Sequence, residues 1–155
     1  MTETHRLNLQ LKLANQGGAW HGPSLRELLD GVTAEQAAAR PLPDAHSIWE
    51  LVNHIAAWER IVMRRLQGEV ISDVPDEINF PPVVEPSEAA WQAALAQLDE
   101  TNRELREAIK QIDDAKLQEL APGKQHPLYI ELYGALQHDL YHAGQIALLK
   151  KLKAS

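Results

Sequence analysis

The sequence predicts an all-α protein that folds as one four-helix bundle domain over residues 1–155. Two observations support this fold class. Apolar residues recur at helical spacing along four stretches, and segments that contain Gly or Pro separate these stretches. The length suits a single core, and 45% apolar with 24% charged residues is ordinary for a globular protein. The composition therefore argues against disorder and against a collagen-like repeat.

The first predicted helix runs from about Thr4 to Asp30 and is the least regular one. Its leucines alternate at first, which alone would suit a strand, but three residues also fit one helical face: Leu7, Leu11 and Ala14. The helical remainder of the chain favours the helix. Two short segments must interrupt or kink this helix before it resumes: Gly17-Gly18 and Gly22-Pro23. A short turn with Thr33 as its cap follows.

The second predicted helix has the clearest start. Ser47-Ile48-Trp49-Glu50 matches the capping box, in which Ser47 and Glu50 bond to each other's backbone amides. Apolar residues then recur at helical spacing until Gly68. From Gly68 to Pro86 the chain is rich in Pro and Asp, a connection of about 18 residues that exceeds what adjacent antiparallel helices need. It suits a crossover that leaves the second and third helices parallel.

The third predicted helix, from Ser87 to about Ile112, is the most periodic, with apolar residues in steps of three and four. Asn102 is the polar residue of this seam, and we expect it to fix the register of the helices. The fourth helix runs from about Pro127 to Lys153. A second apolar stripe makes it either central in the bundle or, as we favour, the interface of a homodimer: Tyr129, Tyr133, Leu136, Leu140, Ala143 and Ala147.

The charge balance and the absence of cysteine limit the function. With 22 acidic against 15 basic residues the net charge is −7, which repels phosphate backbones, so we expect no nucleic-acid partner. No apolar run approaches the roughly 20 residues that cross a bilayer, and the N-terminus does not match a signal peptide. We therefore expect a cytoplasmic protein with no membrane partner. Without cysteine, a metal site must use His, Asp or Glu.

Three histidines form the strongest candidate site. His138 and His142 lie four residues apart, so both side chains leave one face of a helix and can chelate one divalent ion. His54 is the candidate third ligand, because Leu51 and Trp58 place it on the inward face of its helix. The alternative is that these are core or surface histidines satisfied by backbone or Glu groups. Segment 138–142 also resembles the H-E-x-x-H protease motif, but it carries the shorter Asp instead of Glu, which argues against a protease.

Four further residues are candidates for the pocket around the metal, and each also has a simpler explanation. Glu50 could orient the histidine one turn later, although its capping role already explains it. Gln145, one turn beyond the last of the three histidines, could line the pocket or bond within the bundle. Trp58 could wall the pocket or pack in the core. His21 could face the same pocket if the first two helices are antiparallel neighbours, or it could serve only its local turn.

Three segments resemble the DinB/YfiT-like superfamily of metal-binding helical bundles: Trp20–Leu25, Ser47–Glu59 and Gln137–Leu148. The resemblance implies an up-down-down-up bundle and a divalent metal held by three histidines, which correspond to His54, His138 and His142. Zn²⁺, Ni²⁺, Mn²⁺ or Fe²⁺ would keep open positions on such ligands. Characterised relatives include S-transferases and an isomerase that use low-molecular-weight thiols, whereas many members have no known activity.

The sequence thus predicts a metal-dependent enzyme, either a thiol-dependent S-transferase or a hydrolase, which acts on a small molecule. The metal would activate a thiol or water at neutral pH. The alternative is a non-catalytic metal-binding or stress-response protein with a structural or vestigial metal. No general base can be singled out from the sequence. An open coordination position beside a substrate-sized cavity would favour the enzyme.

Overall fold

The computed structural model describes residues 1–152, and all regular elements in that range are helices. Four of them are long: α1 (Glu3–Gln16), α4 (Ile48–Leu66), α6 (Glu88–Lys110) and α7 (Leu128–Leu149). The short ones are α2 (Leu25–Leu29), α3 (Ala34–Ala38), α5 (Asp76–Asn79) and the 3₁₀ turn η1 (Lys116–Gln118). The all-α prediction is confirmed.

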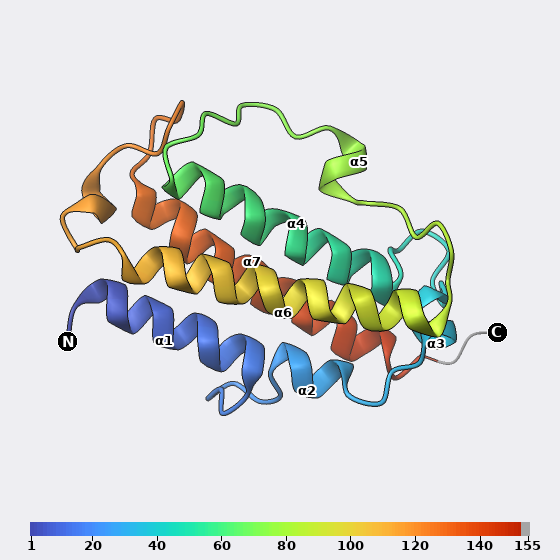
Figure 1. The fold of residues 1–155 in the computed structure, drawn as a ribbon. Coiled ribbons are helices and arrows are strands. Elements are labelled where there is room, and N and C mark those ends of the chain that lie inside the picture. The colour runs from blue at the N-terminus through green and yellow to red at the C-terminus, as the bar shows by residue number, and fades with distance from the viewer. Residues whose placement is uncertain (153–155) are drawn as a thin grey trace.

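The long helices lie along one another, as Figure 1 shows. α1 and α7 run in one direction, and α4 and α6 run in the other. α4 packs against α6 and α7, and α1 packs against the same two helices. The long connection after α4 returns along the bundle, carries α5 and leads to the start of α6. Because the chain returns before α6 begins, α4 and α6 are parallel.

The first predicted helix is two separate helices. α1 ends at Gln16, and the next two residues, Gly17 and Gly18, have φ values of +133° and +79°, which a helix cannot continue through. The chain resumes at α2, where Ser24 and Glu27 form a capping box. Thr33 caps α3 in the same way.

The second and fourth predicted helices are confirmed as α4 and α7, with small changes at their ends. Ser47 N donates to Glu50 Oε2 (2.8 Å) and Glu50 N donates to Ser47 Oγ (3.2 Å), so the predicted capping box starts α4. α7 follows Pro127, whose fixed φ suits a helix start, and ends at Leu149. Lys153, the predicted end of this helix, lies outside the described residues.

The capping box gives a first testable prediction. Ser47→Ala should lower the free energy of unfolding by about 1 kcal/mol, because the backbone amide of Glu50 loses its acceptor at a buried helix start. Ser47→Gly should cost only a few tenths of a kcal/mol. Urea unfolding of both variants measures the difference, and equal losses would mean that the cap is not the cause.

The core consists of two apolar clusters with a polar layer between them. One cluster gathers α2, α3, the first half of α4, the start of α6 and the end of α7 around the Trp49–Trp91 pair. The other gathers α1, the ends of α4 and α6 and the start of α7. Between them, the middle of three long helices carries buried or half-buried polar side chains: His54, Glu59, Thr101, Asn102, His138, Asp139 and His142. The fold therefore brings its chemistry-bearing residues to one level of the bundle.

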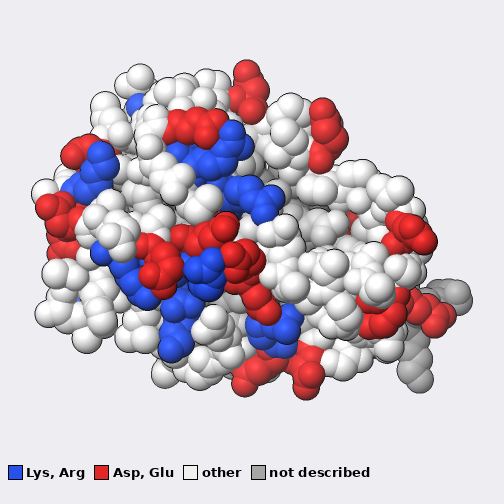
Figure 2. Space-filling model, in the orientation of Figure 1, with Lys and Arg blue, Asp and Glu red and all other residues white. Residues whose placement is uncertain are grey.

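The surface carries mixed charge on the face drawn in Figure 2, where basic side chains lie beside acidic ones. α6 contributes such pairs, with Arg103 bonded to Glu100 at 2.5 Å and Lys110 to Glu107 at 2.6 Å. These pairs are exposed and add little to stability. Within residues 1–152, no helix combines the length and the apolar character that crossing a membrane requires.

Candidate metal centre

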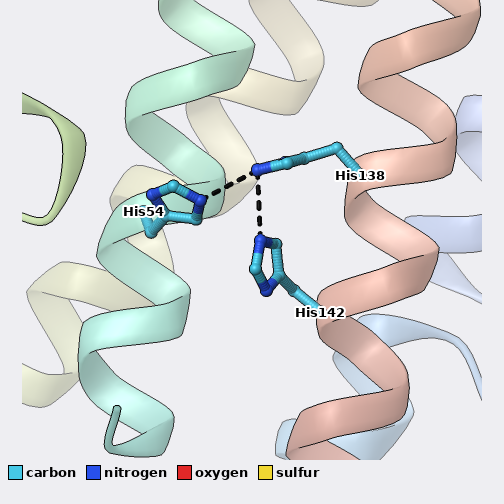
Figure 3. A group of neighbouring side chains, drawn as sticks. All are labelled: His54, His138 and His142. Atoms are coloured by element: carbon cyan, nitrogen blue, oxygen red, sulfur yellow. Dashed lines mark hydrogen bonds between the residues drawn. The ribbon is translucent and has the colours of Figure 1, made fainter. Parts of the chain in front are cut away.

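The three candidate ligands meet between two helices. His54 comes from α4, and His138 and His142 come from successive turns of α7, so their rings face one another as Figure 3 shows. The Nε2 atom of His138 lies 2.9 Å from Nε2 of His54 and 3.1 Å from Nε2 of His142. One ring nitrogen from each residue lies within 4.8 Å of the other two, and the three form a group that could hold a metal ion. The structure thus brings together the histidines that the sequence singled out.

Neighbouring groups fix the rings of two histidines. Nδ1 of His54 contacts the backbone oxygen of Asn79 at 2.5 Å, and Nδ1 of His142 contacts Oε1 of Gln145 at 2.5 Å. Both oxygens are acceptors, so each Nδ1 carries the hydrogen. In both neutral rings the lone pair is therefore on Nε2 and points toward the centre of the triad.

The donor set fits a divalent metal. His138 Nε2 can donate at most one hydrogen, yet it faces two Nε2 lone pairs, so at least one of the two contacts is repulsive without a cation. Burial lowers the pKa of His54 to about 4, and burial with the two neighbouring histidines lowers that of His138 to about 3, so protons do not fill this role at neutral pH. Three nitrogens bonded tetrahedrally to one ion at about 2.0–2.1 Å lie about 3.3–3.4 Å apart, slightly wider than the 2.9 Å and 3.1 Å contacts of His138 Nε2.

The crossover between α4 and α6 completes the wall around His54. Asn79, at the end of α5, accepts from His54 through its backbone and from Trp58 Nε1 through Oδ1 at 2.9 Å. Phe80 stacks on the His54 ring at 3.9 Å and on the His46 ring at 3.8 Å. Sequence reasoning missed Asn79 and Phe80, because an irregular Pro-rich segment has no period from which a side chain's direction can be read. One signal was present, since Phe80 is the chain's single phenylalanine in a polar connection.

A cavity of about 480 Å³ opens beside the triad. Its walls include the apolar side chains of Trp58, Val62 and Ile130, and all three histidines line it. A polar group lies elsewhere on its wall: Glu131 accepts from Arg65 at 2.9 Å and contacts His126 Nε2 at 2.8 Å. The triad therefore borders a largely apolar space of small-molecule size instead of being sealed in the core.

The other sequence candidates divide into two groups. Two candidates lie at the candidate metal centre: Trp58 lines the cavity beside the triad, and Gln145 contacts the ring of His142. Glu50 instead caps α4 and pairs with Arg40. His21 lines a different cavity, beside the C-terminal half of α7.

The placement of His21 corrects an assumption about helix neighbours. The expected shared pocket required the first helix to lie antiparallel beside the helix that carries His54. In the structure α1 packs against α6 and α7, and it ends at Gln16, so His21 lies in the following loop. It faces Leu140 and Gly144 on another side of α7.

A buried polar cluster behind the triad was also missed by the sequence analysis. Glu59 accepts from Thr101 Oγ1 at 2.8 Å and from Asn102 Nδ2 at 2.7 Å, so Asn102 links α6 to α4, while its role in fixing the register stays a prediction. Burial raises the pKa of Glu59 to about 7. Burial and the adjacent Glu59 raise the pKa of Asp139 well above its usual value. These two carboxyls meet because of how α4 and α7 are positioned relative to each other along the bundle axis. Sequence spacing does not determine that relative position.

Comparison with known proteins identifies the family of the chain. A family model described as the DinB superfamily matches residues 19–146, a range that contains all three histidines. No match was found among curated proteins or among solved structures. The family model covers well over half of the chain, which confirms the resemblance seen in its motifs. The chain belongs to the DinB superfamily.

Proposed function

We propose that this protein is a metal-dependent enzyme that holds Zn²⁺, Ni²⁺, Mn²⁺ or Fe²⁺ on His54, His138 and His142. It acts on a small molecule as a thiol-dependent S-transferase or as a hydrolase, on an up-down-down-up four-helix bundle. One observation carries the proposal: the three Nε2 atoms converge on the wall of a cavity of about 480 Å³. A purely structural site would be expected to be closed to ligands.

The donor set and the cavity support this chemistry. An ion on three neutral imidazoles keeps open positions, where it lowers the pKa of a thiol or water that binds. The protein has no cysteine, so a thiol would come from a low-molecular-weight cosubstrate. Asn79 and Gln145 hold two of the rings, and Trp58 with its apolar neighbours excludes water from one side of the reacting groups.

The first experiment is the metal content of the purified protein by plasma mass spectrometry. We expect about one divalent ion per chain, lost in His54→Ala and in His142→Ala, because each variant removes one of three ligands. His21→Ala is the matched control and should keep the ion, since His21 lines a separate cavity. Protein that is metal-free and also fails to take up added Zn²⁺, Ni²⁺ or Mn²⁺ would overturn the proposal.

A non-catalytic metal-binding or stress-response role is the second candidate, and one observation favours it. Glu131, a carboxylate on the cavity wall, is already paired with Arg65 and His126, so it is not free to act as a base. The metal-loaded protein should be assayed for thiol consumption with electrophile panels and for hydrolysis with ester and amide panels. Turnover that is lost in His54→Ala supports the enzyme, and its absence from every panel supports the non-catalytic role.

The homodimer and the cytoplasmic location stay predictions, as does the absence of nucleic-acid and membrane partners. The second apolar stripe of α7 has another explanation, because α7 packs against α1 and α2 as well as α4. Size-exclusion chromatography with light scattering at micromolar concentration tests the dimer. A monomer alone would contradict it.

A further inference from the structure

One histidine of the triad lacks the support that the other two have. His54 and His142 each place Nδ1 against an oxygen at 2.5 Å. Nδ1 of His138 is buried and has no hydrogen-bond partner among the described residues. A metal-bound histidine almost always donates its second ring N–H to an acceptor, which sets the tautomer and the ring's orientation. His138 therefore needs an acceptor on its Nδ1 side.

Asp139 is positioned to supply that acceptor. Its Oδ1 lies 4.0 Å from His138 Nδ1, and the residue is only 2% exposed. Its carboxyl pairs with that of Glu59, and neither of its oxygens receives a hydrogen bond from a nitrogen or hydroxyl donor in residues 1–152. A separation of 4.0 Å is too long for a direct bond, but one bridging water or a small rotation of the carboxyl closes it. A buried donor without a partner and an acceptor with free lone pairs thus lie 4.0 Å apart in the interior.

Glu59 holds Asp139 in place from the neighbouring helix α4. It is 1% exposed and packs against the Asp139 carboxyl. Its own oxygens receive bonds from Thr101 and Asn102, which anchor it to α6. Asp139 is consequently enclosed by α4, α6 and α7 and has little freedom to turn away from His138.

We propose that Asp139, held by Glu59, is the positioning residue that accepts the Nδ1 hydrogen of His138 and so directs Nε2 of that ring at the metal. The inference rests on the metal binding proposed above. In its ionised form, which a bound cation favours, the carboxyl also makes the imidazole a stronger donor than a backbone or amide oxygen does. His138 is the histidine whose Nε2 contacts both others, so its orientation fixes the geometry of the whole triad.

The competing explanation is a structural one, in which Glu59 and Asp139 only link the long helices. Removing a core polar link would then lower stability and leave the metal affinity of the folded protein unchanged. Thr101→Val is the matched control for this effect. It removes one donor to Glu59 at the same level of the bundle without touching Asp139.

The test compares Zn²⁺ affinity in wild type, Asp139→Asn, Asp139→Leu and Thr101→Val, by competition with a chromogenic chelator. We expect a loss of about 10- to 100-fold in Asp139→Leu. Asp139→Asn should lose less, since its amide oxygen can still accept, and Thr101→Val should bind like wild type. Proton NMR of the Zn²⁺-loaded protein adds a direct readout, because the His138 Nδ1–H signal should move upfield in both Asp139 variants.

Each result decides between the explanations. Equal affinities and an unmoved His138 signal in folded Asp139→Leu overturn the inference while the three-histidine site stands. If Asp139→Leu does not fold, the same comparison on the nearly isosteric Asp139→Asn decides. Wild-type protein that binds no Zn²⁺ overturns both this inference and the proposed function.

Discussion

Zn²⁺ at a thousand times its dissociation constant should stabilise the protein against unfolding by about 4 kcal/mol, because the ion binds the assembled triad in preference to the unfolded chain. The three ligands come from two helices, and 84 residues of sequence separate His54 from His138. Unfolding therefore separates the ligands and destroys the site. For a chain of 155 residues this corresponds to a rise of roughly 8–16 °C in the unfolding temperature. Calorimetry with Zn²⁺ and with a chelator measures the shift.

Two variants locate the stabilisation. His138→Ala removes the ring that contacts both of the others and should abolish the shift. His21→Ala removes an exposed histidine beside a different cavity and should keep the shift in full. A shift of wild-type size in His138→Ala would place the ion elsewhere on the protein.

Local spacing explains why much of this site was predictable. Residues four apart on a helix share a face, so the α7 pair could be recognised without any tertiary information. His54 was recognisable from apolar residues on either side of it along α4. The capping box of α4 and the glycines after α1 are equally local signals, and all of them match the structure. The choice of metal and the reaction depend on no such spacing and stay predictions.

The missed residues depend on distances that sequence spacing does not set. His21 was misplaced because the neighbours of α1 are α6 and α7, a matter of bundle arrangement. Asn79 reaches His54 from an irregular crossover, where no periodicity indicates direction. The Glu59–Asp139 pair forms only because α4 and α7 meet at one height. A charged residue next to Trp58 on an inward helix face was the signal for Glu59, but it did not identify the partner.

Acidification should destabilise the metal-free protein between about pH 6.5 and pH 4. The pKa of His138 falls to about 3 through burial and the two adjacent histidines, and that of His54 falls to about 4 mainly through burial. Burial also lowers the pKa of His142. A histidine whose pKa is lower in the folded protein than in the unfolded chain stabilises the fold at pH values above its unfolded pKa. This stabilisation disappears as the pH falls toward the folded pKa. Near pH 5 the unfolded chain thus binds extra protons at all three histidines.

The buried carboxyls act in the opposite direction over part of this range. Burial raises the pKa of Glu59 to about 7 and raises that of Asp139 well above its usual value. Folded carboxyls of this kind keep protons that the unfolded chain releases above about pH 4.5, so acidification from pH 7 favours the fold at these two sites. Two carboxyls against three histidines leave a net difference of about one proton. Near pH 5 stability should therefore fall by about 1.4 kcal/mol per pH unit. The change should be shallower toward pH 6.5, where the unfolded histidines are only half charged, and steeper below pH 4.5.

Denaturant unfolding at a series of pH values tests this balance with two variants that shift it in opposite directions. His138→Gln removes one histidine, so the slope near pH 5 should fall close to zero. Asp139→Asn removes one raised carboxyl, so the slope should approach twice the wild-type value. Equal slopes in the two variants would contradict the assignment, because they alter opposite sides of the proton balance at adjacent positions on α7.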